Sequence, residues 1–290
     1  MFTYRYHAIS LVAVFLALGI GVLLGVAIGE EGVVSNASKD LESSLRGDLQ
    51  NARATNSRLR REVRLREDYE SQAYPGLVHD TLPDHRVGIV ALGAMPSGFT
   101  SAIRDAVEPA GAQVDSLSVI AAPLPRGKLG SALDGTKLQR VDHSEDVLAQ
   151  LGRRIGRQLV AGGDLVQRLR HDLFSTSRGE YGALDAVVLV RGSDHRDLER
   201  RQKSAQDRFE RELISALKDT DAAVVGVEST GTDPSQIGFM KDRGVSSVDD
   251  IDLTVGKTAL VWAMLGGDGH YGVKSSAERL LPAPPERAGR

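Results

Sequence analysis

The sequence predicts an α/β protein with an N-terminal single transmembrane helix, a coiled-coil helix, and a mostly parallel sheet domain with helices on both faces. Three observations lead to this prediction: an apolar run near the N-terminus, a segment with heptad spacing, and a later alternation of apolar and amphipathic segments. We expect a cytoplasmic tail (1–7), a transmembrane anchor (8–29), a coiled coil (35–72), an extracytoplasmic α/β domain (84–273) and a disordered tail (274–290).

The apolar run extends from Ala8 to Ile28 and has Ser10 as its only polar side chain. A helix rises about 1.5 Å per residue, so this run spans about 30 Å, the thickness of the hydrocarbon core of a bilayer. A cleaved signal peptide has a shorter apolar region and a small-residue cleavage site. A buried helix of a soluble protein is rarely apolar on every face. We therefore favour an uncleaved signal anchor over both alternatives.

The charges beside the run predict its orientation. Arg5 precedes it, and Glu30 and Glu31 follow it. Positive charge favours the cytoplasmic side, so we expect the N-terminus inside and most of the chain outside the cell membrane.

Small residues recur every four positions in the run and therefore share one helix face: Ala17, Gly21, Gly25 and Gly29. Small residues at this spacing allow two helices to approach closely in lipid. The alternative is that glycine is simply common in membrane helices.

The next segment, from Ser35 to about Glu70, contains no proline and has a/d heptad spacing. The seam positions step by three and four: Leu49, Ala52, Asn56, Leu59 and Val63. Asn56 at an a position favours a dimer in fixed register. The alternative is a solvated stalk helix, but the small-residue face also favours a homodimer. We expect the helix to end before Pro75.

The remaining chain alternates buried strands with helices, which is typical of a parallel sheet covered on both faces. The predicted strands are Val87–Leu92, Gln113–Ile120, Leu184–Val190 and Ala222–Val227, with Val245–Ile251 as a candidate fifth. The predicted helices are Ser97–Ala110, a stretch from Ser144 to Phe174 interrupted near Gly162, Asp197–Lys218, and Thr254–Leu265.

Composition excludes several classes of function. The net charge is −3, which gives no reason to expect nucleic acid binding. The chain has no cysteine, so it has no disulfides, thiolate metal sites or cysteine nucleophile. Gly256-Lys257-Thr258 resembles the end of a phosphate-binding loop, but Ile251 stands where that motif needs glycine, so we expect no nucleotide. The G-x-S-x-G and H-E-x-x-H motifs are both absent, and we expect no enzyme activity.

A carboxylate cluster, Asp249, Asp250 and Asp252, precedes the last predicted helix. Three carboxylates could hold Mg²⁺ or Ca²⁺. The alternative, which we favour, is that they cap the helix beginning at Thr254, where carboxylates meet the positive end of the helix dipole.

Two segments carry a resemblance to a known family: "YHAISLVAVFLALGIGVLLG" and "VSSVDDIDLTVGKTALVWAMLGGDGHYGVK". They, and the order of anchor, coiled coil and α/β domain, resemble the actinobacterial copper transporter family named for mycobacterial copper transport protein B. The resemblance implies a role in copper transport or homeostasis, with a location in the outer envelope suggested by analogy.

Under this resemblance copper is the ligand to test. The candidate copper ligands are His270, Tyr271, Met240 and Met264. The histidines show no i, i+2 or i, i+4 pair and the methionines are far apart, so a copper site would have to be assembled from distant positions. A single helix of Leu, Val and Gly also offers no polar pore lining.

Two functions therefore remain open. The first is a non-catalytic, membrane-anchored protein of this family, linked to copper homeostasis. The second is an envelope scaffold, whose dimeric coiled coil and α/β domain recruit a partner that acts in the cell wall or in division.

Overall fold

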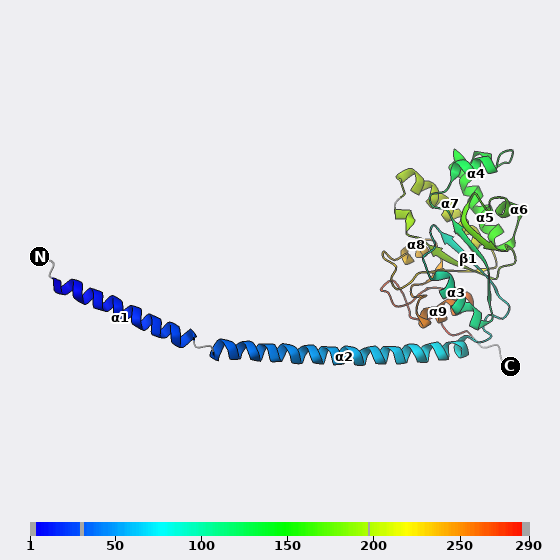
Figure 1. Ribbon diagram of the computed structural model, residues 1–290. Helices are drawn as coiled ribbons and strands as arrows, with labels where there is room; N and C mark the ends of the chain where they lie inside the picture. The colour runs from blue at the N-terminus through cyan, green and yellow to red at the C-terminus, as the bar shows by residue number, and fades with distance from the viewer. Residues whose placement is uncertain (1–3, 30–31, 197, 286–290) are drawn as a thin grey trace. The chain divides into compact units, whose positions relative to one another are not determined.

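The computed structural model describes residues 4–29, 32–196 and 198–285 (Figure 1). The chain divides into two compact units, Met1–Arg66 and Glu67–Arg290. The fold class predicted from the sequence is confirmed: an N-terminal apolar helix, a long helix, and a mostly parallel seven-stranded sheet with helices.

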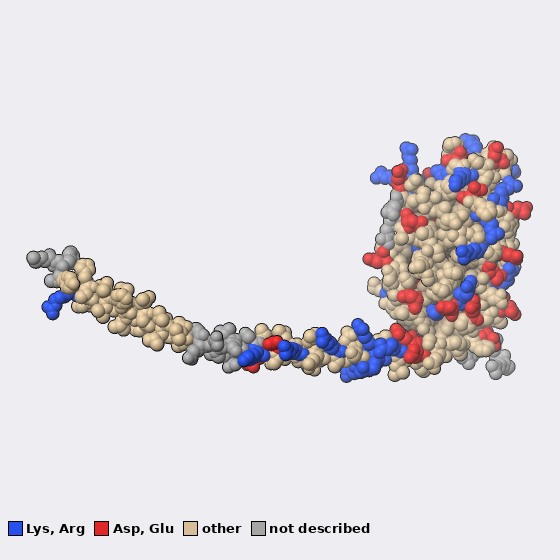
Figure 2. Space-filling view, viewed as in Figure 1, with Lys and Arg blue, Asp and Glu red and all other residues tan. Residues whose placement is uncertain are grey.

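The first helix, α1 (Tyr4–Gly29), contains a stretch, Tyr4–Ala27, long and apolar enough to cross a membrane. Figure 2 shows no acidic or basic side chain along this helix beyond its beginning. Its small-residue face is open, since a Cβ atom added at Gly21 or Gly25 would meet nothing within 4 Å. Gly29 is the last residue of α1.

The second helix, α2 (Gly32–Val78), is continuous and has Pro75 inside it, so the prediction that this helix ends before Pro75 is wrong. Proline disrupts a helix by removing an N–H donor and by crowding the preceding turn. Here the last turn is held by packing in the second unit, because Tyr74 and Val78 are buried. The Tyr74 hydroxyl also donates a 2.6 Å hydrogen bond to the carbonyl of Ala106.

The sheet of the second unit has the order β3-β2-β1-β4-β5-β6-β7. Neighbouring strands are parallel, except that β3 is antiparallel to β2. The strands are β1 (Arg86–Leu92), β2 (Gln113–Ile120), β3 (Phe174–Gly179), β4 (Ala186–Arg191), β5 (Ala223–Val227), β6 (Ser246–Val248) and β7 (His270–Tyr271).

Helices cover both faces of the sheet, and a hydrophobic core lies on each face. One core includes α5 (Glu145–Ala161) and α7 (Arg200–Lys218), which pack closely against each other. The other includes α3 (Phe99–Val107) and α9 (Thr254–Met264). The shorter helices are α4 (Arg126–Ala132), α6 (Asp164–Arg168), α8 (Ile237–Lys241) and the 3-10 turns Glu108–Ala110, Gln139–Asp142 and Asp194–Arg196.

The predicted strands and long helices all form, but two strands were not predicted. Phe174, expected at the end of a helix, begins β3, and β7 has only two residues. The beginning of the expected disordered tail is also hydrogen-bonded. The N–H of Glu278 donates to the carbonyl of His270 at 2.7 Å, so the chain returns to the edge of the sheet after β7.

Candidate functional site

The carboxyl ends of parallel strands are the usual location of ligand sites in open α/β sheets. In this protein the segments that follow β4, β5 and β6 carry two neighbouring groups of charged side chains. We call Glu228, Asp249, Asp250 and Asp252 the acidic cluster. The basic pocket is the cavity whose charged lining residues are Arg191, Lys203, Asp207, Arg211, Lys218, Asp219, Asp242 and Arg243.

Asp249 follows β6 and is fully buried. Its carboxylate accepts hydrogen bonds from the backbone N–H groups of Val273 (2.8 Å) and Lys274 (3.1 Å). The approach requires glycine at position 272, because a Cβ atom there would lie 2.0 Å from Asp249 Oδ1. Asp249 therefore fixes the turn that follows β7.

Two other carboxylates of the cluster are also occupied by protein donors. Asp252 accepts from the backbone N–H (2.7 Å) and the hydroxyl (2.6 Å) of Thr230. Glu228 forms an ion pair with Lys274 Nζ at 2.6 Å and accepts from the Ser235 hydroxyl at 2.8 Å. These contacts tie together the loops that follow β5, β6 and β7.

Asp250 differs from its neighbours. It is fully buried, and neither of its carboxylate oxygens has a hydrogen-bond partner among the residues that the structure describes. Burial raises the pKa of Asp250 to about 7, and the negative charges of Asp249 and Asp252 add to this shift. A proton on Asp250 therefore titrates near neutral pH.

The helix-capping interpretation of these aspartates is wrong. The N-cap of α9 is Leu253, and no side chain makes a capping hydrogen bond there. The physical reason is that Asp249 and Asp252 are directed to other loops. Within residues 4–29, 32–196 and 198–285, no group of three or more His, Asp or Glu side chains is placed to hold a metal ion.

The candidate copper ligands are distributed over both faces of the sheet. His270 and Tyr271 are consecutive residues of β7, so their side chains point to opposite faces. His270 Nδ1 lies 2.8 Å from the Ser247 hydroxyl, and the Tyr271 hydroxyl donates to the carbonyl of Asp268 at 3.0 Å. Burial raises the pKa of the Tyr271 hydroxyl.

The two methionines lie in different hydrophobic cores. Met240, in α8, is in the core that contains α5 and α7, where its side chain packs against Gly226 of β5. Met264, in α9, belongs to the core on the opposite face. The structure does not bring Met240 and Met264 together.

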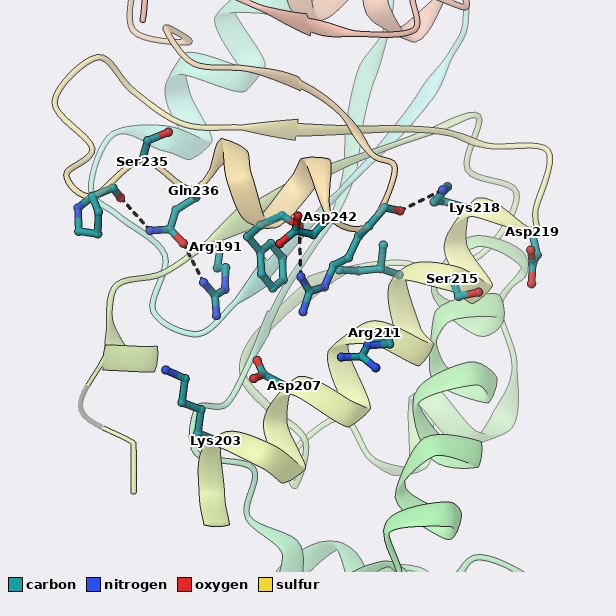
Figure 3. Close-up of a pocket in the computed structure, with 14 residues that line it drawn as sticks. Arg191, Lys203, Asp207, Arg211, Ser215, Lys218, Asp219, Ser235, Gln236 and Asp242 are labelled. Atoms are coloured by element: carbon teal, nitrogen blue, oxygen red, sulfur yellow. Dashed lines mark hydrogen bonds between the residues drawn. The ribbon is translucent and has the colours of Figure 1, made fainter. Parts of the chain in front are cut away.

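The basic pocket lies between the end of β4, helix α7 and helix α8, and it has a volume of about 800 Å³ (Figure 3). Figure 3 shows Lys203, Asp207 and Arg211 along α7, on the opposite side of the pocket from Arg191 and Gln236. The basic side chains are Arg191, Lys203, Arg211, Lys218 and Arg243, and the acidic ones are Asp207, Asp219 and Asp242.

Two of these arginines stack on the aromatic ring of Phe239 in α8. The guanidinium carbon of Arg243 lies 3.5 Å from the centre of the Phe239 ring, and that of Arg191 lies 4.0 Å from it. Arg191 also donates to Gln236 Oε1 at 2.9 Å. Burial lowers the pKa of Arg243; Glu210 opposes this shift and Arg191 adds to it. The two positive charges are thus held close together in a partly desolvated site.

The basic pocket was not predicted from the sequence. A signal was present in α7, where Lys203, Asp207, Arg211, Ser215 and Asp219 follow one another at intervals of four and therefore share one helix face. Arg191 lies nine residues before α7 and Arg243 lies 25 residues after it, and the fold brings both to the cavity that this helix lines.

Comparison with known proteins places the whole architecture in one family. The family model described as "Copper transport outer membrane protein, MctB" matches residues 1–282. Relatives named "Copper transporter MctB" in Mycobacterium tuberculosis and Mycobacterium bovis are 24% identical over 310 aligned positions, which cover 96% of this chain and 98% of theirs. With its apolar N-terminal helix, long helix and α/β unit, the chain belongs to the MctB copper transport family.

Proposed function

We propose that this chain is a non-catalytic, membrane-anchored protein that supports copper homeostasis from the outer side of the cell membrane through its α/β unit. The observation that supports this proposal is the contrast between the apolar helix α1 and the α/β unit. Among the described helices, α1 alone is long and apolar enough to span a bilayer, and it precedes a separately compact unit of sheet and helices.

In this proposal α1 anchors the protein and does not conduct copper. Its side chains beyond Arg5 and His7 are apolar apart from Ser10, whereas an ion pathway needs polar groups along its length. The charges support an N-terminus inside, because Arg5 lies at the N-terminal end of the span and Glu30 follows the span.

Replacing the anchor tests this proposal. A strain that lacks the protein would be complemented with the full chain, with a chain whose residues 4–29 are exchanged for an unrelated single-span helix of the same orientation, and with a chain lacking residues 4–29. We expect copper tolerance to be restored by the first two and not by the third. Loss of tolerance with the exchanged helix, at equal protein level, would instead give α1 a direct role in copper movement.

A second function is favoured by α2. The apolar residues of its heptad seam are half exposed, including Leu49, Leu59 and Val63. An exposed seam at a/d spacing fits a parallel dimer, in which each helix covers the seam of the other. Such a dimer would present two α/β units outside the membrane and would act as a scaffold for an envelope protein of cell-wall growth or division.

The absence of cysteine makes the dimer simple to test, since one introduced cysteine is unique in the chain. Leu59→Cys lies on the seam, and Ser57→Cys, two residues away, lies off it. Under mild oxidation of intact cells we expect a disulfide-linked dimer for Leu59→Cys and little for Ser57→Cys. Equal cross-linking of both variants would reject the seam as the interface.

A further inference from the structure

We propose that the basic pocket binds a phosphate monoester, held by the guanidinium groups of Arg191 and Arg243 and by the side chains of Lys203 and Arg211 on α7. This site involves no copper and is independent of the function proposed above. It rests on the charge of the lining, the fixed position of the two arginines, and the volume of the cavity.

The charge of the pocket is incompletely neutralised. Its lining has five basic side chains and three carboxylates. In the part of the chain that the structure describes, none of Arg191, Lys203, Arg211 and Arg243 has a carboxylate oxygen within the 4.0 Å limit of an ion pair. The excess of two positive charges matches a phosphate monoester, which carries nearly two negative charges at neutral pH.

The two arginines are held in place before any ligand arrives. Both guanidinium groups stack on the Phe239 ring, and each donates one hydrogen bond to an oxygen of α8 or its N-cap: Arg191 to Gln236 Oε1 (2.9 Å) and Arg243 to the Phe239 carbonyl (3.2 Å). A planar guanidinium group presents several donors in a fixed fork that suits phosphate oxygens. Because stacking already restricts both side chains, less conformational entropy is lost on binding.

The form of the cavity narrows the class of ligand. A volume of about 800 Å³ exceeds that of a phosphate ion and is typical of sites for small organic molecules. Among the described residues that line the pocket, Phe239 alone is aromatic, and its ring already stacks on the two arginines. These lining residues therefore offer no free aromatic surface for a nucleobase. A phosphorylated sugar or the head group of phosphatidic acid, each a phosphate monoester, fits this chemistry.

Thermal unfolding and calorimetric titration of the full chain in neutral detergent test the proposal at constant ionic strength. The probes are inorganic phosphate, glucose 6-phosphate and dihexanoyl phosphatidic acid, with chloride, glucose and dihexanoyl phosphatidylcholine as their matched controls. We expect saturable binding and a raised Tm with phosphate-bearing probes, because a ligand that binds only the folded state stabilises it. Tightest binding of glucose 6-phosphate would indicate a soluble ester, and tightest binding of phosphatidic acid a lipid head group.

Variants then locate the binding. Lys203→Gln combined with Arg211→Gln removes two exposed cations without changing the core, and should weaken binding about tenfold or more. Arg191→Gln should weaken it similarly, but the double variant keeps the test decisive if that protein does not fold. Arg154→Gln, an exposed change on α5 outside the pocket, is the control and should bind normally. No difference between each probe and its control, or unchanged affinity in the double variant, would overturn the proposal.

Discussion

The acidic cluster and the basic pocket both lie at the carboxyl ends of the sheet strands, but they differ in how their charges are compensated by the protein. In the acidic cluster, Glu228, Asp249 and Asp252 each accept hydrogen bonds from the protein itself. In the basic pocket, Arg191 and Arg243 stack on Phe239, and neither has a carboxylate oxygen within 4.0 Å among the described residues. Gln236 connects the two, because its backbone N–H donates to Glu228 and its side chain accepts from Arg191.

The difference indicates which group is structural and which is available to a ligand. A carboxylate whose oxygens accept hydrogen bonds from protein groups on other loops stabilises the fold, and its loss leaves those donors without their acceptor. Cations that surround a cavity without a carboxylate in ion-pair contact repel one another, and an anion that enters the cavity reduces this repulsion. The same edge of the sheet therefore has one side that holds loops together and one side suited to binding.

We expect the largest loss of stability from a substitution at Gly256, which packs against the backbone of the acidic cluster. In Gly256→Ala, the new Cβ atom would lie 2.0 Å from the backbone carbonyl oxygen of Asp250, so backbone must move. We expect the free energy of unfolding to fall by about 3 kcal/mol or more, measured by urea denaturation.

Gly238→Ala in α8 is the matched control, because a Cβ atom there would meet nothing within 4 Å. Alanine is favoured over glycine inside a helix, so this variant should be stabilised by up to about 1 kcal/mol. Similar behaviour of the two alanine variants would show that the acidic cluster is not tightly packed.

The next effect tests the hydrogen bonds of Asp249. Asp249→Ala removes the carboxylate that accepts hydrogen bonds from the partly buried backbone N–H groups of Val273 and Lys274. We expect a loss of about 2–4 kcal/mol in the free energy of unfolding. Asp249→Asn keeps one acceptor oxygen and should lose less. Equal losses in the two variants would mean that the negative charge, not the hydrogen bonds, stabilises the turn after β7.

Asp250 is the carboxylate of the acidic cluster that has no hydrogen-bond partner within the described part of the chain. Because the pKa of Asp250 is raised to about 7 in the folded state, the folded protein binds a proton that the unfolded chain releases near pH 4. The contribution of Asp250 to stability is therefore fully present below pH 4 and is lost as the pH rises through 7.

Asp250→Asn should remove this dependence. The difference in Tm between Asp250→Asn and the wild type should increase in favour of the variant from pH 4 to pH 8, equivalent to about 1–4 kcal/mol at the upper end. Parallel Tm curves over this range would contradict a protonated Asp250. A metal or other cation bound at Asp250 would lower its pKa and give the opposite trend.

Much of the fold follows from local sequence patterns. The apolar run of α1 and strands such as β1, β2 and β4 were predicted within a few residues, because continuous apolar runs are a strong local signal. Two strands were missed for the opposite reason. β3 has the sequence Phe174-Ser-Thr-Ser-Arg-Gly179 with one buried residue, and β7 has only two residues, so pairing with neighbouring strands defines both.

The sites were less predictable than the fold. The three aspartates are recognisable as a cluster in the sequence, but the predicted helix-capping role is wrong, because the partners of Asp252 and Asp249, Thr230 and the backbone of Val273, lie on other loops. Pro75 was expected to end α2, but packing of Tyr74 in the core extends the helix past it. In both cases the local structure depends on a contact between segments that are distant in the sequence, and such a contact leaves no signal in the local sequence pattern.

The smallest effect on stability is expected in the basic pocket. Arg211 is exposed on α7 and forms no hydrogen bond or ion pair with the described residues, so Arg211→Gln removes a charge that repels Arg243 and breaks no such bond. Without ligand, the free energy of unfolding should change by no more than about 0.5 kcal/mol, and in the stabilising direction. In saturating glucose 6-phosphate the order should reverse, because the wild type gains more from binding. If Arg211→Gln lowered the free energy of unfolding by more than about 1 kcal/mol without ligand, Arg211 would be a structural charge, as Asp249 is. The basic pocket would then not differ from the acidic cluster in this respect.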